Sequence, residues 1–131
     1  MFIDTSAIVA ILTLEPEAEA FAEQVNRATN PMTGAHVRLE ACMNLARILG
    51  VEISTATELF DEFLHQAKIT VLPISDSISR GAVEAYDRFG KGRHPAGLNF
   101  GDCLSYACAA HIRAPILFKG RDFGRTDLPL A

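Results

Sequence analysis

The chain alternates between short apolar runs and longer stretches in which apolar residues recur at helical spacing. The short runs lie at residues 1–4, 69–74 and 115–118, and polar residues bound each of them, as is typical of β-strands. A fourth candidate strand lies near residues 128–130. Residues 33–37 also have some strand character, but we do not count them as a strand.

The amphipathic stretches predict six helices. Thr55 and Glu58 form a capping-box pattern for the fourth helix along the chain, and Asn99 is placed to cap the last. Strands that alternate with helices predict a parallel sheet with helices on both faces. We therefore expect an α/β fold, a three-layer α/β/α sandwich around a short, mostly parallel sheet, formed by residues 1–131 as a single domain. The expected helices cover residues 6–12, 18–25, 35–49, 55–64, 75–89 and 100–112.

Composition narrows the class of protein. The chain of 131 residues is 49% hydrophobic and 21% charged, which is typical of a folded globular domain. No apolar run approaches the roughly 20 residues that span a bilayer, and no basic region precedes an apolar stretch at the N-terminus. We therefore expect a cytoplasmic location. Cys42, Cys103 and Cys108 form no CxxC pair, and we expect them to be buried free thiols.

Four carboxylates occupy positions that a parallel sheet would bring to one edge. Asp4 ends the first expected strand, at 1–4, and Asp122 follows the run at 115–118, so both lie near the carboxyl end of an expected strand. Glu40 and Asp102 lie early in expected helices, whose starts face the same edge. Because ligands of such sheets bind outside the carboxyl ends of the strands, we expect the four side chains to converge.

Most of these carboxylates also have a purely structural interpretation. Asp102 can complete a capping box with Asn99. Glu40 can be an exposed helix residue, and Asp122 can belong to a turn. Asp4 is harder to explain, because a charge between two apolar runs is costly unless it is paired or bound to a cation.

A cluster of carboxylates suggests a metal site. Carboxylates brought together repel one another unless a cation neutralises them, and hard cations such as Mg²⁺ prefer oxygen ligands. A water molecule polarised by such a cation can attack a phosphodiester. The pattern therefore indicates metal-assisted hydrolysis of a phosphate ester.

The motifs around these acids resemble those of the PIN-domain ribonucleases, and most closely the VapC-like toxins of bacterial toxin–antitoxin pairs. The similar segments are MFIDTSAIVA, VRLEACMNL, LNFGDCLSYACA and ILFKGRDFGRTDL, and the resemblance covers nearly the whole chain in order and spacing. The most specific part is GKGRHPAGLNFGD followed by LFKGRDF. The resemblance implies a PIN-like fold and an endoribonuclease toxin that depends on Mg²⁺, for which Mn²⁺ can substitute. It implies that the catalytic and metal-binding residues are Asp4, Glu40, Asp102 and Asp122.

The same resemblance implies partners. They are an RNA substrate, a second copy of the chain in a homodimer, and a cognate antitoxin protein through which alone the toxin contacts DNA. One position departs from the pattern: many PIN domains carry an acidic residue two positions before the Asp of the final DF pair, and here that position is Gly120. The fourth acid is then Asp122 or, as the alternative, Asp127.

Basic residues near two of the acids are candidate RNA contacts. The net charge of −4 argues mildly against a broad basic surface for nucleic acid, but local phosphate contacts on the rim of an acidic pocket remain compatible with it. Their alternative interpretation is a solvated surface. The predicted substrate-binding residues are Thr5, Ser6, Arg93, Lys119 and Arg121.

Two other functions fit parts of the pattern. A catalytically inactive PIN-like module that only binds a protein would share the fold, and an incomplete set of acids would favour it. A phosphoacceptor receiver domain also gathers carboxylates around Mg²⁺, but it needs paired acids after the first strand and an Asp at the end of a middle strand. Here Thr5 and Ser6 follow Asp4, and no Asp lies between Asp4 and Asp61, which is inside an expected helix.

Overall fold

The computed structural model describes residues 1–131 and consists of four short strands, six α-helices and one 3₁₀ helix. The predicted alternation of strands and helices is confirmed. In chain order the elements are β1 (Phe2–Ile3), α1 (Thr5–Leu12), α2 (Ala18–Arg27), β2 (Met32–Gly34), α3 (Ala35–Leu49), α4 (Ile53–Gln66), β3 (Thr70–Leu72), α5 (Asp76–Phe89), α6 (Phe100–His111), β4 (Ile116–Leu117) and η1 (Phe123–Arg125).

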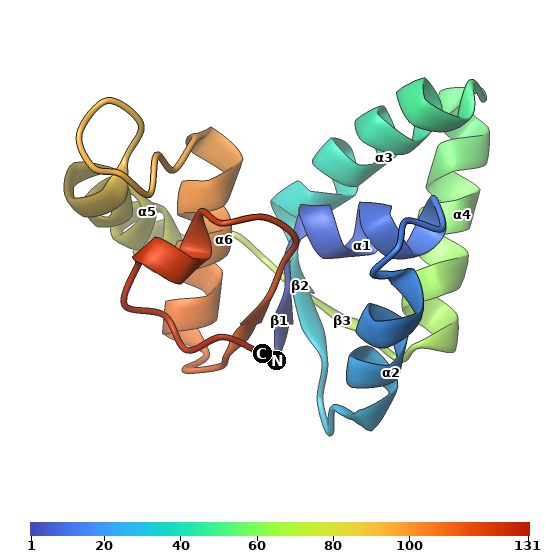
Figure 1. Ribbon diagram of the computed structural model, residues 1–131, viewed down its shortest axis with the longest axis horizontal. Helices are drawn as coiled ribbons and strands as arrows, with labels where there is room; N and C mark the ends of the chain where they lie inside the picture. The colour runs from blue at the N-terminus through green and yellow to red at the C-terminus, as the bar shows by residue number, and fades with distance from the viewer.

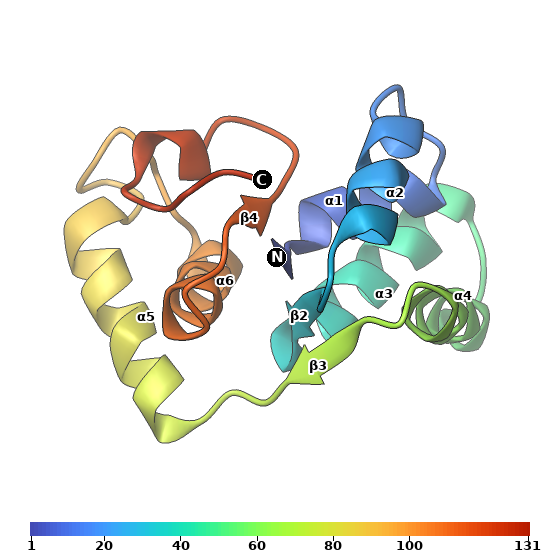
Figure 2. The same ribbon diagram turned by 90° about the horizontal axis from the view of Figure 1, so that it is seen from below.

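The four strands form one parallel sheet in the order β3-β2-β1-β4. In the register of the sheet, Phe2 pairs with both Met32 and Ile116. Helices α5 and α6 lie on one side of the sheet, and α1 to α4 lie on the other (Figures 1 and 2). The expected three-layer α/β/α sandwich is therefore present.

The strand order makes the boundary between β1 and β4 a topological switch point. The chain leaves β1 for β2 and β3 on one side, whereas β4 is added on the other side of β1. Connections that diverge in this way open a crevice at the carboxyl ends of the two strands, which is where such sheets bind ligands. Asp4 immediately follows β1 at this point.

Burial on both faces explains why β1 and β4 are apolar throughout. Phe2, Ile3 and Ile116 are fully buried, as expected of parallel strands covered by helices on both sides. The three cysteines are buried and free, as predicted, and burial raises the pKa of the Cys108 thiol to about 12.

None of the helices is both long and apolar enough to cross a membrane.

Two strand predictions were wrong. Residues 32–34, which we did not count as a strand, form β2 in the interior of the sheet, where Thr33 Oγ1 also donates a hydrogen bond to Ile3 O at 2.7 Å. Pairing with strands on both sides stabilises this segment, although Pro31 before it and Gly34 at its end locally favour a turn. The candidate strand near 128–130 contributes only one bridge, between Ile116 and Leu130.

The two predicted helix caps had different outcomes. Helix α4 begins at Ile53, ahead of the predicted Thr55–Glu58 capping box, and its N-cap residue makes no side-chain cap. Helix α6 does have a capping box: Asp102 N–H donates to Asn99 Oδ1 at 2.9 Å, and Asn99 N–H donates to Asp102 Oδ2 at 3.1 Å. A start fixed by this box gives the first turn of α6 a defined orientation at the sheet edge.

Candidate active site

Asp4 is held at the end of β1 as the N-cap residue of α1. Its Oδ2 accepts hydrogen bonds from Ser6 N–H at 3.1 Å and from Ser6 Oγ at 2.7 Å. The residue is 5% exposed. Because both bonds use Oδ2, the other carboxylate oxygen accepts no hydrogen bond from the protein. Asp4 is therefore a rigidly held acid with one oxygen available to a ligand.

Glu40 lies beside Asp4 because α3 starts directly after β2, at the same edge of the sheet. Thr5 Oγ1 donates a hydrogen bond to Glu40 Oε1 at 2.9 Å. Burial raises the pKa of Glu40 above its usual range; the hydrogen bond from Thr5 opposes this, and the charge of Asp4 adds to it. Glu40 is thus a partly desolvated carboxylate close to a second one.

Asp102 completes the group from the first turn of α6. Burial raises its pKa to about 6, against the hydrogen bond from the Asn99 backbone. The charges of Asp4, Asp122 and Glu40 raise this pKa further, so all four predicted acids act on one region. The capping interpretation is correct, and the cap leaves the other oxygen of Asp102 without a protein donor. Asp4, Glu40 and Asp102 converge on one cavity as expected, whereas Asp122 does not line it.

These side chains line an open cavity of about 500 Å³. Asp4, Glu40 and Asp102 all contribute to its wall, and none of them forms an ion pair. The cavity is also lined by Asn44 and Arg47, which sequence reasoning missed. Helical periodicity could have identified them, since Asn44 and Arg47 follow Glu40 by four and seven residues and so lie on the same face of α3.

Of the two candidates for the fourth acid, only Asp122 remains free of protein partners. It precedes η1, is exposed, and forms no side-chain cap. Asp127 is bound elsewhere: Tyr106 Oη donates to its Oδ1 at 2.5 Å and Arg88 donates to its Oδ2 at 2.9 Å. The hydrogen bond from Tyr106 and the contact with Arg88 lower the pKa of Asp127 despite some burial.

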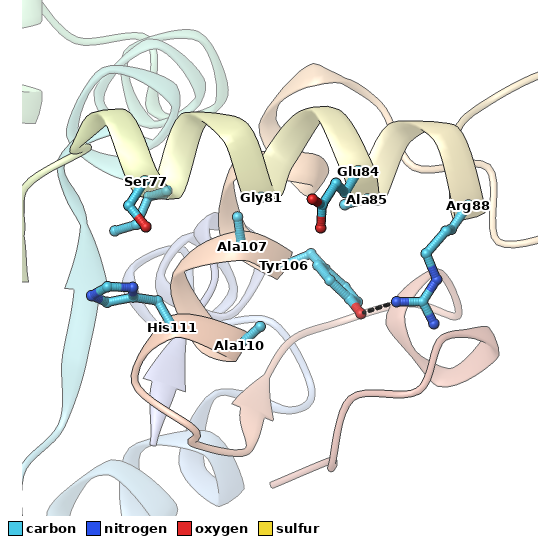
Figure 3. A pocket seen from close by; sticks show the side chains of 10 residues that line it. Ser77, Gly81, Glu84, Ala85, Arg88, Tyr106, Ala107, Ala110 and His111 are labelled. Atoms are coloured by element: carbon cyan, nitrogen blue, oxygen red, sulfur yellow. Dashed lines mark hydrogen bonds between the residues drawn. The ribbon is translucent and has the colours of Figure 1, made fainter.

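The Arg88–Tyr106–Asp127 cluster borders a separate cavity between α5 and α6. Figure 3 shows Arg88 reaching from α5 toward the Tyr106 hydroxyl, a contact of 3.4 Å. This cavity, of about 300 Å³, shares no residue with the acidic one. The cluster therefore ties the C-terminal segment to α5 and α6, and Asp127 is not a member of the candidate site.

The predicted substrate-binding residues have different environments. Ser6 orients Asp4 and accepts a hydrogen bond from Lys119 N–H at 2.9 Å, while Thr5 orients Glu40. Lys119 lines the cavity, but its Nζ lies 2.6 Å from Glu15 Oε2 and 3.1 Å from Glu17 Oε2.

The two predicted arginines are outside the cavity wall. Arg93 pairs with Asp87 at 2.8 Å, and Arg121 is exposed without an ionic partner. Arg47, by contrast, lines the cavity and has no acidic partner; its guanidinium donates only to Asn44 Oδ1, at 3.3 Å.

The chemistry of the acidic cavity suits a hard divalent cation. Its acids offer oxygen ligands only, and a positive charge would stabilise the ionised form of Asp102, whose pKa is raised by burial and by the neighbouring acids. No three of the side chains form a ready-made metal cage. Mg²⁺ does not need one, since it is commonly held by one or two carboxylates and keeps several waters. The residues therefore fit Mg²⁺ or Mn²⁺.

Comparison with known proteins places this geometry in a family. The PIN domain family matches residues 1–128. Ribonuclease VapC28 of Mycobacterium tuberculosis is 44% identical over 132 residues, which cover 100% of this chain and 97% of that protein.

Solved structures share the fold at low sequence identity. Mycobacterium tuberculosis VapC20, a sarcin-ricin loop cleaving toxin, superposes with a TM-score of 0.78 at 20% identity, covering 99% of this chain and 97% of the other. A chain of a toxin–antitoxin complex from Klebsiella pneumoniae gives a TM-score of 0.72 at 14% identity, covering 99% and 95%. The sequence match along the whole chain, together with this fold, shows that the protein belongs to the PIN-domain family, among its VapC-like members.

Proposed function

We propose that this chain is the toxin of a toxin–antitoxin pair and that it hydrolyses RNA phosphodiester bonds with the help of a divalent cation. One observation above all supports the proposal: Asp4, Glu40 and Asp102 line a single cavity without any ion pair. Such an arrangement is unfavourable unless a cation binds there. The relative that is 44% identical is named a ribonuclease.

Each acid has a distinct part in this proposal. The oxygens of Asp4 and Asp102 that lack protein donors would hold the cation, with Asp122 contributing from its loop. When bound, Mg²⁺ or Mn²⁺ supplies a positive charge that acidifies a water molecule and neutralises charge on the phosphate. Glu40 can bind the same cation or, through Oε2, accept a proton from the attacking water. A raised pKa brings Glu40 closer to the operating pH of a general base.

Arg47 is the best-placed RNA contact inside the cavity. It is cationic, lines the wall beside Asn44, and is not neutralised by an acid, so it can pair with a phosphate oxygen. Lys119 is already paired with two glutamates, and a phosphate would have to compete with them. Arg93 and Arg121 remain proposed contacts for parts of the RNA that extend beyond the cavity.

We infer that the toxin is a cytoplasmic homodimer and binds a cognate antitoxin, through which it contacts DNA indirectly. Large apolar side chains are exposed on α3 and α6, with Leu39 at 66% and Phe100 at 85%. Exposed apolar surface of this kind is typical of protein contact sites. Light scattering of the purified chain should give twice the mass of one chain, and a monomer at micromolar concentration would contradict the dimer.

The central experiment measures RNA cleavage by the purified chain, free of antitoxin. With Mg²⁺ or Mn²⁺ it should cut RNA, EDTA should abolish cleavage, and mapping the RNA ends after brief induction in cells should identify the target. Persistent cleavage in EDTA, or an Asp4→Asn variant that cuts as well as wild type, would contradict the metal-dependent mechanism. A folded chain that binds antitoxin but cuts no RNA with either cation would instead be an inactive PIN-like binding module.

A further inference from the structure

Gly101 is the second residue of α6, and its own backbone does not explain why it is glycine. The glycines with a positive φ are Gly50, Gly92, Gly97 and Gly120, so Gly101 has a conformation open to any residue. Within a helix, glycine is less favourable than every residue except proline. The reason for glycine at this position must therefore lie in its surroundings.

The space that a side chain would need at position 101 is occupied by the carboxyl group of Glu40. A Cβ added to Gly101 would lie 2.1 Å from Glu40 Oε2, 2.6 Å from Cδ and 2.8 Å from Oε1. These three atoms are the nearest neighbours of that position. Thr5 Oγ1 donates to Glu40 Oε1, so the carboxyl group is held between a hydrogen bond from α1 and the bare backbone of α6.

We propose that Gly101 is a positioning residue for Glu40. The absent side chain leaves the only room in which the Glu40 carboxylate can keep its bond to Thr5 and lie against the first turn of α6, beside Asp102. A methyl group at position 101 displaces the flexible end of Glu40 while leaving the backbone of both helices in place. The catalytic consequence rests on the proposed function, whereas the displacement of Glu40 does not.

The first test is structural and needs no metal. Crystal structures of the wild type and Gly101→Ala, both grown with EDTA, should differ in the distance from Glu40 Oε1 to Thr5 Oγ1. It should increase from 2.9 Å to beyond hydrogen-bonding range in the variant. The matched control is Gly81→Ala in α5, which lies with Ala107 at the cavity between α5 and α6 (Figure 3), not at the acidic one. Its Cβ would make an ordinary contact with Ala107 Cβ at 3.4 Å. The control should keep the Thr5–Glu40 bond.

The second test uses a double variant. Gly101→Ala should reduce the rate of RNA cleavage by roughly 10²-fold, as misplacement of a reacting group by about 1 Å can do, whereas Gly81→Ala should stay within about twofold of wild type. In a Glu40→Ala background the same substitution should cause no further loss. Should Gly101→Ala lower the melting temperature, Glu40→Ala should restore it by removing the collision.

The outcomes separate the two proposals. A wild type that cuts no RNA would end the proposed function, while the crystal structures would still decide the role of Gly101. A Gly101→Ala structure that keeps the Thr5–Glu40 bond would overturn the positioning role. So would an equal loss of melting temperature from Gly101→Ala with and without Glu40.

Discussion

Two carboxylates near the C-terminal half of the chain, Asp102 and Asp127, have opposite electrostatic environments. Asp102 is surrounded by other acids and has a pKa raised to about 6, chiefly by burial. Asp127 accepts hydrogen bonds from Tyr106 and Arg88, and its pKa is lowered. Helix α6 contributes to both sites, since it supplies both Asp102 and Tyr106. An acid whose charge is balanced by a cation and a hydrogen-bond donor of the protein stabilises the fold. An acid whose charge is left unbalanced is instead suited to binding a positively charged ligand.

The largest expected effect is the loss of activity on neutralising the unbalanced acids. Asp4→Asn and Asp102→Asn should each weaken Mn²⁺ binding and reduce RNA cleavage by roughly 10³-fold, since each removes charge fixed at the reacting centre. Isothermal titration with Mn²⁺ and a fluorogenic RNA assay measure the two effects. If Asp102→Asn is nearly silent while Asp122→Asn is the most damaging, Asp102 serves only as a helix cap.

The other two acids should separate binding from chemistry. Glu40→Gln should lose roughly 10²-fold in cleavage while keeping much of the affinity for Mn²⁺, because it removes a proton acceptor and keeps an oxygen ligand. Asp122→Asn should retain measurable activity, since its loop between Gly120 and Gly124 holds it less rigidly than a strand end or helix turn. The same two assays apply. Equal losses of affinity and rate in Glu40→Gln would make Glu40 a metal ligand alone.

Unbalanced acids should also make the metal-free protein less stable as the pH rises. The pKa of Asp102 is raised from an ordinary value of 3.8 to about 6 in the folded chain, so between these values the folded state binds more protons than the unfolded state. The free energy of unfolding attributable to Asp102 should therefore fall by about 1 to 2 kcal/mol from pH 4 to pH 6, allowing for partial exposure. Denaturation in EDTA measures it, and Asp102→Asn should remove this component.

The smallest expected effect concerns the balanced acid. Asp127→Asn should lower the free energy of unfolding at neutral pH by about 1 kcal/mol, because it weakens an exposed contact with Arg88 and a partly buried one with Tyr106. RNA cleavage and Mn²⁺ affinity should remain at the wild-type level. The lowered pKa means that this stabilisation is present above about pH 4 and is lost in acid. Loss of cleavage in a folded Asp127→Asn variant would show that the two regions are coupled.

Much of the fold follows from local patterns in the sequence. Apolar spacing located all six helices, and the Asn99 cap was recognised because capping depends on residues three positions apart. The segment of β2 was missed because its three residues carry little strand signal of their own. Hydrogen bonds to β1 and β3, which are distant in sequence, stabilise it as an interior strand.

Much of the candidate site, like much of the fold, could be predicted from the sequence. An acid at the end of an apolar run and acids early in helices are local features, and parallel topology then places Asp4, Glu40 and Asp102 at one edge. Asn44 and Arg47 were also within reach, because helical periodicity alone puts them on the face of Glu40.

The choice between Asp122 and Asp127 could not be made in this way. The residues that balance Asp127 lie 39 and 21 positions away in the chain, and only the packing of α5 against α6 brings them to it. The contact of Gly101 with Glu40 likewise joins two helices whose approach no local pattern describes. The sequence by itself determined which charged residues lie at strand ends and helix starts, because helix and strand periods are local. The tertiary structure decided which of these charges are paired with an opposite charge, because Coulomb interactions depend on distance in space.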